Sequence, residues 1–370
     1  MSISQYLEFM VKSQASDLYF SAGSPVLIKV EGVTRPLAEH HQLTPGEVKE
    51  LAYSLMKDHH IRTFEADWEV NVGVSVSGVG RFRMNVLRQR GEVAFVIRYV
   101  KSHPPTIEAL NLPTFLKTLV MEKRGLVLVA GSTGSGKSTT LASMLDYRNS
   151  QMHGHILTIE DPIEFIHSYK KSIVNQREVG TDTKSYANAL KNAMREAPDV
   201  ILIGEIRDEE TMRNAINYAE TGHLCLATIH AANAVETLDR VVNFFPDSAH
   251  KQLLIDLANN LKAIVCQRLL IGLDGKRWPA VESLKDSPYI SELIKEGKLD
   301  EIREAFERNL EKEIVTFDQA ILDLYRRGVI AKAEAINNAD SHHNMTVQIR
   351  LMDNQSHPQS TGQMDYDSGR

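Results

Sequence analysis

Residues Gly125 to Thr139 read Gly-Leu-Val-Leu-Val-Ala-Gly-Ser-Thr-Gly-Ser-Gly-Lys-Ser-Thr. The four apolar residues after Gly125 predict a buried parallel strand, and the residues after the glycine-rich loop have helix-forming character. Strand, loop and helix therefore occur in the order of a phosphate-binding loop, and the pattern Gly-x-x-x-x-Gly-Lys-Ser is matched from Gly131 onward. A merely flexible glycine loop would not need this order. The stretch predicts an α/β domain that binds a nucleoside triphosphate.

Each residue type in this loop has a chemical reason. Gly131, Gly134 and Gly136 allow positive φ, so that backbone amides can approach phosphate oxygens. The helix that follows offers its free N–H groups to the same anion. Lys137 adds a mobile, exposed cation for the β- and γ-phosphates, and the Ser138 hydroxyl can ligate Mg²⁺. The predicted nucleotide-binding residues are Gly131, Ser132, Thr133, Gly134, Ser135, Gly136, Lys137, Ser138 and Thr139.

The composition describes an ordinary globular protein. The 370 residues predict two folded domains, with 42% hydrophobic residues, 24% charged residues and a net charge of −6. A pI near 6.2 argues against sequence-independent nucleic-acid binding. No apolar run approaches the ~18 residues that span a bilayer, and the first residues lack a signal-peptide layout. Cys225 and Cys266 are expected to be buried thiols, so we expect a cytoplasmic protein without membrane insertion.

Residues 1–100 predict a mixed α and β domain. Val70 to Val76 alternate with small or polar residues, and the segments from Arg81 and from Val93 alternate in the same way. These three segments predict an antiparallel meander. Four arginines fall on its middle strand and the following turn: Arg81, Arg83, Arg88 and Arg90. They are either a solvated basic face or a set of cations offered to phosphates.

The rest of the chain divides into three parts. Pro104 and Pro105 predict a stiff linker over residues 101–111. Residues 112–345 predict the nucleotide domain with C-terminal helices, within which 253–271 reads as one long amphipathic helix. The polar residues 346–370 are expected to be a disordered tail.

Acidic residues and histidines follow the predicted strands of the nucleotide domain. A strand over residues 155–159 leads to Glu160-Asp-Pro-Ile-Glu164, and the strand from Val200 delivers Glu205. An acid in this position binds Mg²⁺ or positions water in phosphate-loop enzymes. The strand from Leu224 is preceded by His223 and followed by His230. A histidine at a strand end is usually structural or solvated, but His230 is expected at the same sheet edge as the phosphate loop and Glu205, where its ring N–H can contact the γ-phosphate.

Four segments together resemble the secretion-superfamily ATPases of type II and type IV pilus systems. They are Gly-Ser-Thr-Gly-Ser-Gly-Lys-Ser-Thr from Gly131, Ile-Glu-Asp-Pro-Ile-Glu-Phe from Ile159, Ile-Gly-Glu-Ile-Arg-Asp from Ile203, and Gly222-His with Thr-Ile-His ending at His230. The resemblance covers about residues 1–335. It implies a PAS-like N-terminal domain, carried by Gly-Arg-Phe-Arg-Met-Asn from Gly80, a RecA-like ATPase domain and a hexameric ring. The resemblance is to members without the extra N-terminal domain and tetracysteine metal site of the assembly ATPases, and the sequence has no paired Cys-x-x-Cys motifs.

The resemblance also implies residue roles. Lys137 and Ser138 would bind phosphate and Mg²⁺, with Glu205 as the Walker B acid. Glu164 would be the general base that orients water. His230 and His223 would sense the γ-phosphate, and Arg81 and Arg83 would reach the nucleotide from the N-terminal domain. ATP and Mg²⁺ are the implied cofactors.

Within this superfamily the chain is similar to the pilus retraction ATPases of the PilT/PilU family. Three departures from the PilT pattern favour the PilU-like branch: Ala231 and Ala232 after the histidine, Ala197 before Pro198, and Tyr289-Ile-Ser-Glu-Leu-Ile-Lys-Glu296 in place of Ala-Ile-Arg-Asn-Leu-Ile-Arg-Glu. The implied function is a motor for pilus retraction and twitching motility that acts with a PilT-like ATPase on an inner-membrane platform protein. It would lie at the inner face of the cytoplasmic membrane. A self-sufficient motor, a coupling subunit with little hydrolysis and a nucleic-acid translocase are the alternatives, and the pI argues against the last.

Overall fold

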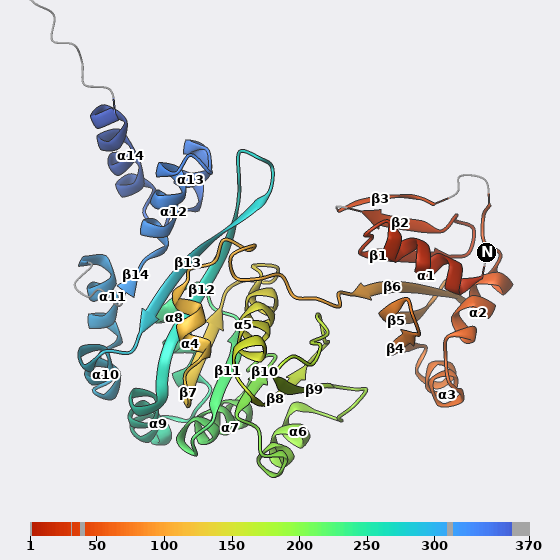
Figure 1. Ribbon diagram of the computed structural model, residues 1–370, viewed down its shortest axis with the longest axis horizontal. Coiled ribbons are helices and arrows are strands. Elements are labelled where there is room, and N and C mark those ends of the chain that lie inside the picture. The colour runs from red at the N-terminus through yellow and green to blue at the C-terminus, as the bar shows by residue number, and fades with distance from the viewer. Residues whose placement is uncertain (1, 31, 38–40, 309–313, 357–370) are drawn as a thin grey trace, which may run out of the picture. The chain divides into compact units, whose positions relative to one another are not determined.

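The computed structural model (Figure 1) describes residues 2–30, 32–37, 41–308 and 314–356. The chain forms two compact units, one from Met1–Thr106 with Leu141–Ile206, the other from Ile107–Thr140 with Arg207–Arg370. Two sheets are present, with strand orders β3-β2-β1-β6-β5-β4 and β14-β13-β12-β7-β11-β10-β8-β9. Each unit is described by itself below.

The first unit begins with the six-stranded antiparallel sheet and three helices. Its core includes Phe20 and Phe95, whose rings stack at 4.3 Å between centroids. Along β5, Phe82, Met84 and Val86 are buried, which confirms the predicted alternation. The elements are α1 (Ile3–Lys12), β1 (Asp17–Ser21), β2 (Leu27–Val30), β3 (Val33–Pro36), α2 (Pro45–Ser54), α3 (Asp58–Asp67), β4 (Glu69–Val76), β5 (Gly80–Gln89) and β6 (Glu92–Val100).

The remainder of the first unit contributes three strands to the larger sheet. The elements are β8 (Gly154–Glu160), β9 (Ser172–Glu178), α6 (Tyr186–Ala193), the short 3₁₀ helix Met194–Glu196, and β10 (Val200–Ile203). β8 pairs in parallel with β9 on one side and with β10 on the other. The carboxyl ends of these three strands therefore lie at one edge of the sheet.

The second unit contains the phosphate-loop strand and most of the C-terminal helices. β7 lies between two parallel neighbours, β11 and β12, and all six of its residues are buried. The elements are α4 (Phe115–Val120), β7 (Gly125–Ala130), α5 (Lys137–Gln151, which continues into the first unit), α7 (Glu209–Glu220), β11 (Leu224–Ile229), α8 (Ala234–Asn243), α9 (Asp247–Asn260), β12 (Leu261–Ile271), β13 (Arg277–Lys285), α10 (Pro288–Lys295), α11 (Leu299–Arg308), β14 (Ile314–Val315), α12 (Phe317–Arg326), α13 (Lys332–Asn338) and α14 (His342–Ser356).

The predicted long helix over residues 253–271 is wrong in its second half. α9 ends at Asn260, and residues from Leu261 form β12, which pairs with β7 and with β13. β12 is buried over most of its length, and apolar residues lie on both of its faces. Such a run has no period that separates a buried strand from a buried helix.

The predicted disordered tail is wrong where the structure describes it. Residues 346–356 belong to α14, because Met345 and Ile349 lie four residues apart and are both buried. The remaining part of that prediction, 357–370, lies outside the described residues. No helix in the described part of the chain is long and apolar enough to cross a bilayer.

β12 also contacts α13, one of the C-terminal helices of its unit. The Arg268 guanidinium donates to the Asn338 carbonyl oxygen at 3.1 Å and pairs with Asp340 at 2.8 Å. Three residues further on, the Ile271 N–H donates to Glu334 Oε1 at 2.8 Å. α13 is therefore fixed to β12 at two points.

Candidate functional site

The loop between β7 and α5 has the backbone that the sequence predicts. Gly131, Gly134 and Gly136 all have positive φ, at 148°, 80° and 91°. A Cβ on Gly131 would lie 2.4 Å from Ser135 Oγ and 2.7 Å from the Gln267 carbonyl oxygen. A Cβ on Gly136 would lie 2.8 Å from Gln267 Nε2. Both positions therefore require glycine for space as well as for backbone conformation.

Lys137 is buried, contrary to the exposed cation that the sequence predicts. Its Nζ donates to the carbonyl oxygens of Gly131 and Ser132, each at 2.9 Å. The ammonium group is therefore held inside the curve of the loop. The loop wraps round the start of α5 and covers the methylene groups of Lys137. The mostly desolvated charge of its ammonium group therefore lies where an anion would bind.

Ser135 supplies a second indication that the loop fits a phosphate group. Its side chain is buried, and its Oγ has no hydrogen-bond partner among the residues that the structure describes. A buried hydroxyl without a partner costs free energy, so such groups commonly mark a ligand position. The hydroxyl, the inward-facing ammonium group and the glycine curvature form a cradle of the size and charge that phosphate oxygens require.

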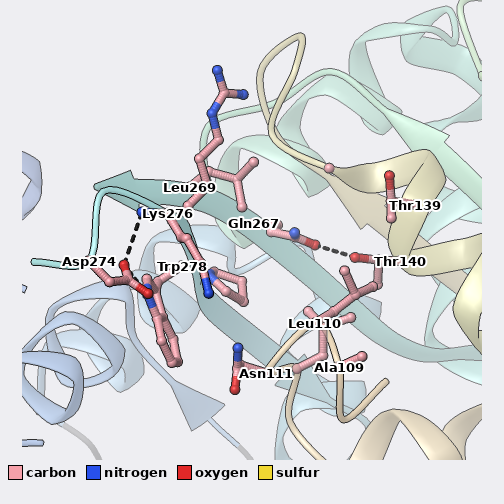
Figure 2. Close-up of a pocket in the computed structure, with 14 residues that line it drawn as sticks. Ala109, Leu110, Asn111, Thr139, Thr140, Gln267, Leu269, Asp274, Lys276 and Trp278 are labelled. Carbon is pink, nitrogen blue, oxygen red and sulfur yellow. Dashed lines mark hydrogen bonds between the residues drawn. The ribbon is translucent and has the colours of Figure 1, made fainter. Parts of the chain in front are cut away.

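Gln267 of β12 belongs to this site and was missed by the sequence reasoning. Thr140 Oγ1, in the first turn of α5, donates to Gln267 Oε1 at 2.6 Å (Figure 2). Gln267 thereby braces the helix that begins at the phosphate loop. The β-branched pair Ile264-Val265 is the signal that could have identified β12 as a strand and Gln267 as part of the sheet.

A cavity of about 480 Å³ adjoins the loop in the same unit. Figure 2 shows Thr139, Thr140 and Gln267 on one side and Asn111, Asp274 and Trp278 across from them. Asp274 Oδ1 accepts from the Lys276 N–H at 2.9 Å and from Trp278 Nε1 at 3.2 Å, which fixes the β12–β13 turn. Half of the residues that line the cavity are apolar, among them Leu269 and Trp278, and the other half are polar or charged, among them Asp274, Lys276 and Arg277.

The structure places the two histidines at opposite ends of β11. β11 pairs with β7 in parallel register, Leu224 with Gly125 and Ile229 with Ala130. His230 therefore follows β11 at the end where the phosphate loop follows β7. His223 precedes β11 and is separated from the other end of the strand by roughly 20 Å, at about 3.3 Å per residue. Its Nδ1 contacts Thr221 Oγ1 at 3.1 Å and the Tyr218 carbonyl oxygen at 3.2 Å. The structure does not bring His223 to the phosphate loop of its own chain.

The acidic residues of the first unit follow neighbouring strand ends. Gly204 N–H donates to the Ile159 carbonyl oxygen at 2.7 Å, so Glu205 after β10 lies beside the end of β8. Glu164 is exposed and Glu205 is partly exposed. Burial raises the pKa of Glu160 to about 7, although hydrogen bonds from Thr158 at 2.7 Å and from Gln176 at 3.2 Å oppose that rise.

The four arginines of β5 and its turn have different surroundings. Arg81 Nη2 lies 3.9 Å from Glu178 Oε2, and Arg83 is partly exposed on the same face. Arg88 pairs with Glu65 at 2.5 Å and lies over the Phe64 ring, which makes it part of the α3 contact. Arg90 is exposed in the turn. Arg81 and Arg83 remain the two candidates for a phosphate.

Cys225 and Cys266 are buried free thiols as predicted, and burial raises the pKa of both. Within the ranges that the structure describes, no group of three or more His, Cys, Asp or Glu side chains could hold a metal ion.

Comparison with known proteins agrees with this site. The family "Type II/IV secretion system protein" matches residues 2–352. The Pseudomonas aeruginosa type IV pilus ATPase PilU is 45% identical over 352 residues, covering 95% of this chain and 92% of that protein. The P. aeruginosa type IV pilus retraction ATPase PilT is 42% identical, covering 92% and 98%. A crystal structure of the pilus retraction motor PilT with bound ADP has a TM-score of 0.86 and covers 92% of this chain and 98% of that chain at 42% identity.

These matches extend over both units and include every loop and strand end described above. The chain belongs to the type II/IV secretion system protein family.

Proposed function

We propose that this protein is an ATPase of the type IV pilus machinery that powers pilus retraction, and hence twitching motility, together with a PilT-like ATPase. The observation that carries the proposal is the cradle of the phosphate loop, in which Lys137 Nζ lies inside the glycine curve beside the unpartnered Ser135 hydroxyl. The pilus relatives and the ADP bound in the PilT structure support it.

We assign the residues of the site by their chemistry. The amides of residues 131–139 and the Lys137 ammonium group bind the β- and γ-phosphates. Ser138 and Glu205 hold Mg²⁺, which neutralises charge on the phosphates when bound. Glu164 orients and deprotonates the attacking water. His230 contacts the γ-phosphate, whereas we do not extend that role to His223.

The nucleoside half of ATP enters the cavity shown in Figure 2. Thr139 and Thr140 line it directly after the phosphate loop, so a nucleotide with its phosphates in the loop would extend its sugar and base toward Leu269 and Trp278. Arg81 and Arg83 add cations that balance charge on the transferred phosphoryl group. The protein works as a homo-hexamer in the cytoplasm, against an inner-membrane platform protein.

The exposed face of α10 supports dependence on a partner motor. This helix buries Ile290, Leu293 and Ile294, so its departures from the PilT pattern at Tyr289 and Glu292 lie on the exposed face. A changed exposed face leaves folding intact but alters what the helix contacts. This observation favours joint action with a PilT-like ATPase over a self-sufficient motor.

The test is pilus retraction in cells that lack their own PilT-like and PilU-like ATPases. The chain is returned alone, or with a PilT whose phosphate-loop lysine is disabled. We expect retraction only in the second strain, because this chain supplies hydrolysis and the partner supplies docking. Retraction by the chain alone would identify a self-sufficient motor. Failure in both, with no ATP turnover by the purified chain, would leave the coupling subunit.

A further inference from the structure

Glu178, the last residue of β9, is a buried carboxylate shared between two parts of the first unit. Its Oε2 accepts a hydrogen bond from the Ile163 N–H at 3.2 Å. The same oxygen lies 3.9 Å from Nη2 of Arg81 on β5. Its other oxygen, Oε1, accepts from Thr181 Oγ1 at 3.3 Å. One atom therefore contacts both the backbone beside Glu164 and a candidate phosphate-binding arginine.

β9 fixes the acidic segment on both sides of Glu164. Glu178 holds the residue before it through the Ile163 N–H. Gln176 holds the residues after it, because its Nε2 donates to the Phe165 carbonyl oxygen at 2.8 Å and its Oε1 accepts from the His167 N–H at 2.9 Å. Glu164 itself is exposed. Backbone hydrogen bonds to β9 therefore hold the chain before and after Glu164, and the Glu164 N–H itself is hydrogen-bonded to the Glu160 carboxyl at the end of β8.

The space around Arg81 is shaped for this contact. Gly73 lies on the neighbouring strand β4, and a Cβ there would lie 3.6 Å from Arg81 Nη2 and 3.9 Å from Thr181 Cγ2. The guanidinium group thus reaches the turn after β9 across a glycine. The Arg81 side chain remains about 29% exposed, so it is free to rotate toward solvent, whereas the Glu178 side chain is only 10% exposed and stays in place.

We infer that Glu178 is a positioning residue that competes with ATP phosphates for Arg81 and couples the release of Arg81 to the placement of Glu164. This inference rests on the proposed ATPase function and extends it. When Arg81 turns toward a phosphate, the Glu178 carboxylate loses this cation while it still holds the Ile163 N–H. Coupling of this kind is reciprocal, so whatever positions Glu164 also changes the affinity of Arg81 for its carboxylate.

The test compares steady-state ATP hydrolysis by the full-length chain and five variants. Glu178→Gln removes the charge but keeps an oxygen for the Ile163 N–H, so KM for ATP should fall about three-fold or more, since Arg81 is no longer held back. Glu178→Ala also removes the acceptor, so kcat should fall about five-fold or more relative to Glu178→Gln. Arg177→Gln is the matched control on the same strand: it breaks the 2.8 Å pair with Glu196 and should change neither constant by more than about two-fold.

Arg81→Ala, alone and combined with Glu178→Gln, decides whether Glu178 acts through Arg81. In the Arg81→Ala background, Glu178→Gln should leave KM unchanged within about two-fold. Equal effects in both backgrounds, or no effect of Glu178→Gln on KM in the wild type, would overturn the inference while the protein remained an ATPase. Absence of ATP turnover in the wild-type chain would instead refute the proposed function. Circular dichroism of Glu178→Ala separates a kinetic defect from unfolding.

Discussion

Thr140 donates its hydroxyl proton to Gln267 Oε1 at 2.6 Å, which joins the first turn of α5 to the central part of β12. Both side chains are buried. The amide nitrogen of the same glutamine lies where a side chain on Gly136 would have to go. Gln267, which is 127 positions from Thr140 in the sequence, therefore packs against both the phosphate loop and the first turn of α5.

Gln267→Leu removes the acceptor and leaves the Thr140 hydroxyl buried without a partner. The free energy of unfolding should fall by about 1–3 kcal/mol, which urea denaturation of the full chain measures. Thr140→Val combined with Gln267→Leu removes both polar groups and should recover part of that loss. Strict additivity of the two single changes would show that the hydrogen bond contributes nothing.

Gly136→Ala tests the close approach of Gln267 to the loop. We expect ATP affinity to fall more than about ten-fold, because the new Cβ would lie 2.8 Å from Gln267 Nε2 and because φ of 91° strains an L residue. Gly134→Ala is the control, since Gly134 has a similar φ of 80° but no heavy atom of the described residues would lie within 4 Å of its Cβ. Titration with a fluorescent ATP analogue compares the two. Equal losses would mean that backbone strain alone accounts for the effect.

Lys137→Ala should reduce ATP turnover to less than about 1% of wild type, equivalent to more than ~2.7 kcal/mol of transition-state stabilisation. The loop loses both hydrogen bonds from Nζ, yet Lys137 is the first residue of α5 and does not support the core, so far-ultraviolet circular dichroism should be unchanged. Lys137→Arg serves as the charge-preserving comparison. Turnover near the wild-type level in Lys137→Ala would remove the lysine from the catalytic site.

Glu205→Ala should retain ATP binding but lose hydrolysis by about 10²-fold or more, because the acid that holds Mg²⁺ is removed while the loop is intact. Isothermal titration with ATP and a phosphate-release assay separate the two properties. Glu210→Ala, an exposed acid in the first turn of α7, is the control and should hydrolyse ATP normally. Rapid turnover by Glu205→Ala would move the Walker B role to another residue.

The pKa of Glu160 predicts a pH dependence of stability. Its folded value of about 7 lies above the ordinary 4.5, so between these pH values the folded chain binds a proton that the unfolded chain has released. Stability from this group is therefore present below pH 4.5 and is lost as pH rises through 7, by about 1–3 kcal/mol. Glu160→Gln should show a smaller loss between pH 5 and pH 8. The pKa of Glu282 is also raised to about 7 by burial, so some slope persists in the variant. Identical slopes would contradict the assignment.

The phosphate loop could be predicted because its residues are consecutive and each position has a local requirement. Glu160, Glu164 and Glu205 could be placed at strand ends for the same reason, since an apolar run leads directly to each region. His223 shows the limit of such reasoning. His223 directly precedes β11, but it is the other end of β11 that lies beside the phosphate loop. The full length of the strand therefore separates His223 from the loop.

Gln267 and Glu178 could not be predicted because their roles depend on pairing between distant strands. β12 has no polar alternation that would separate it from the helix before it. Among the described strands β9 pairs with β8 alone, and its exposed Ile173 and partly exposed Arg177 obscure any pattern of burial. In both cases the partners of the side chain are fixed by strand order, which no single segment encodes.

The attachment of β12 to α13 gives the loop a direct mechanical link to the C-terminal helices. Gln267 braces the phosphate loop, and the next residue, Arg268, grips the end of α13 through Asn338 and Asp340. Side chains of consecutive strand residues point to opposite faces. β12 therefore contacts α5 through Gln267 on one face and α13 through Arg268 on the other. A displacement of the phosphate loop would therefore also displace α13, because β12 contacts both.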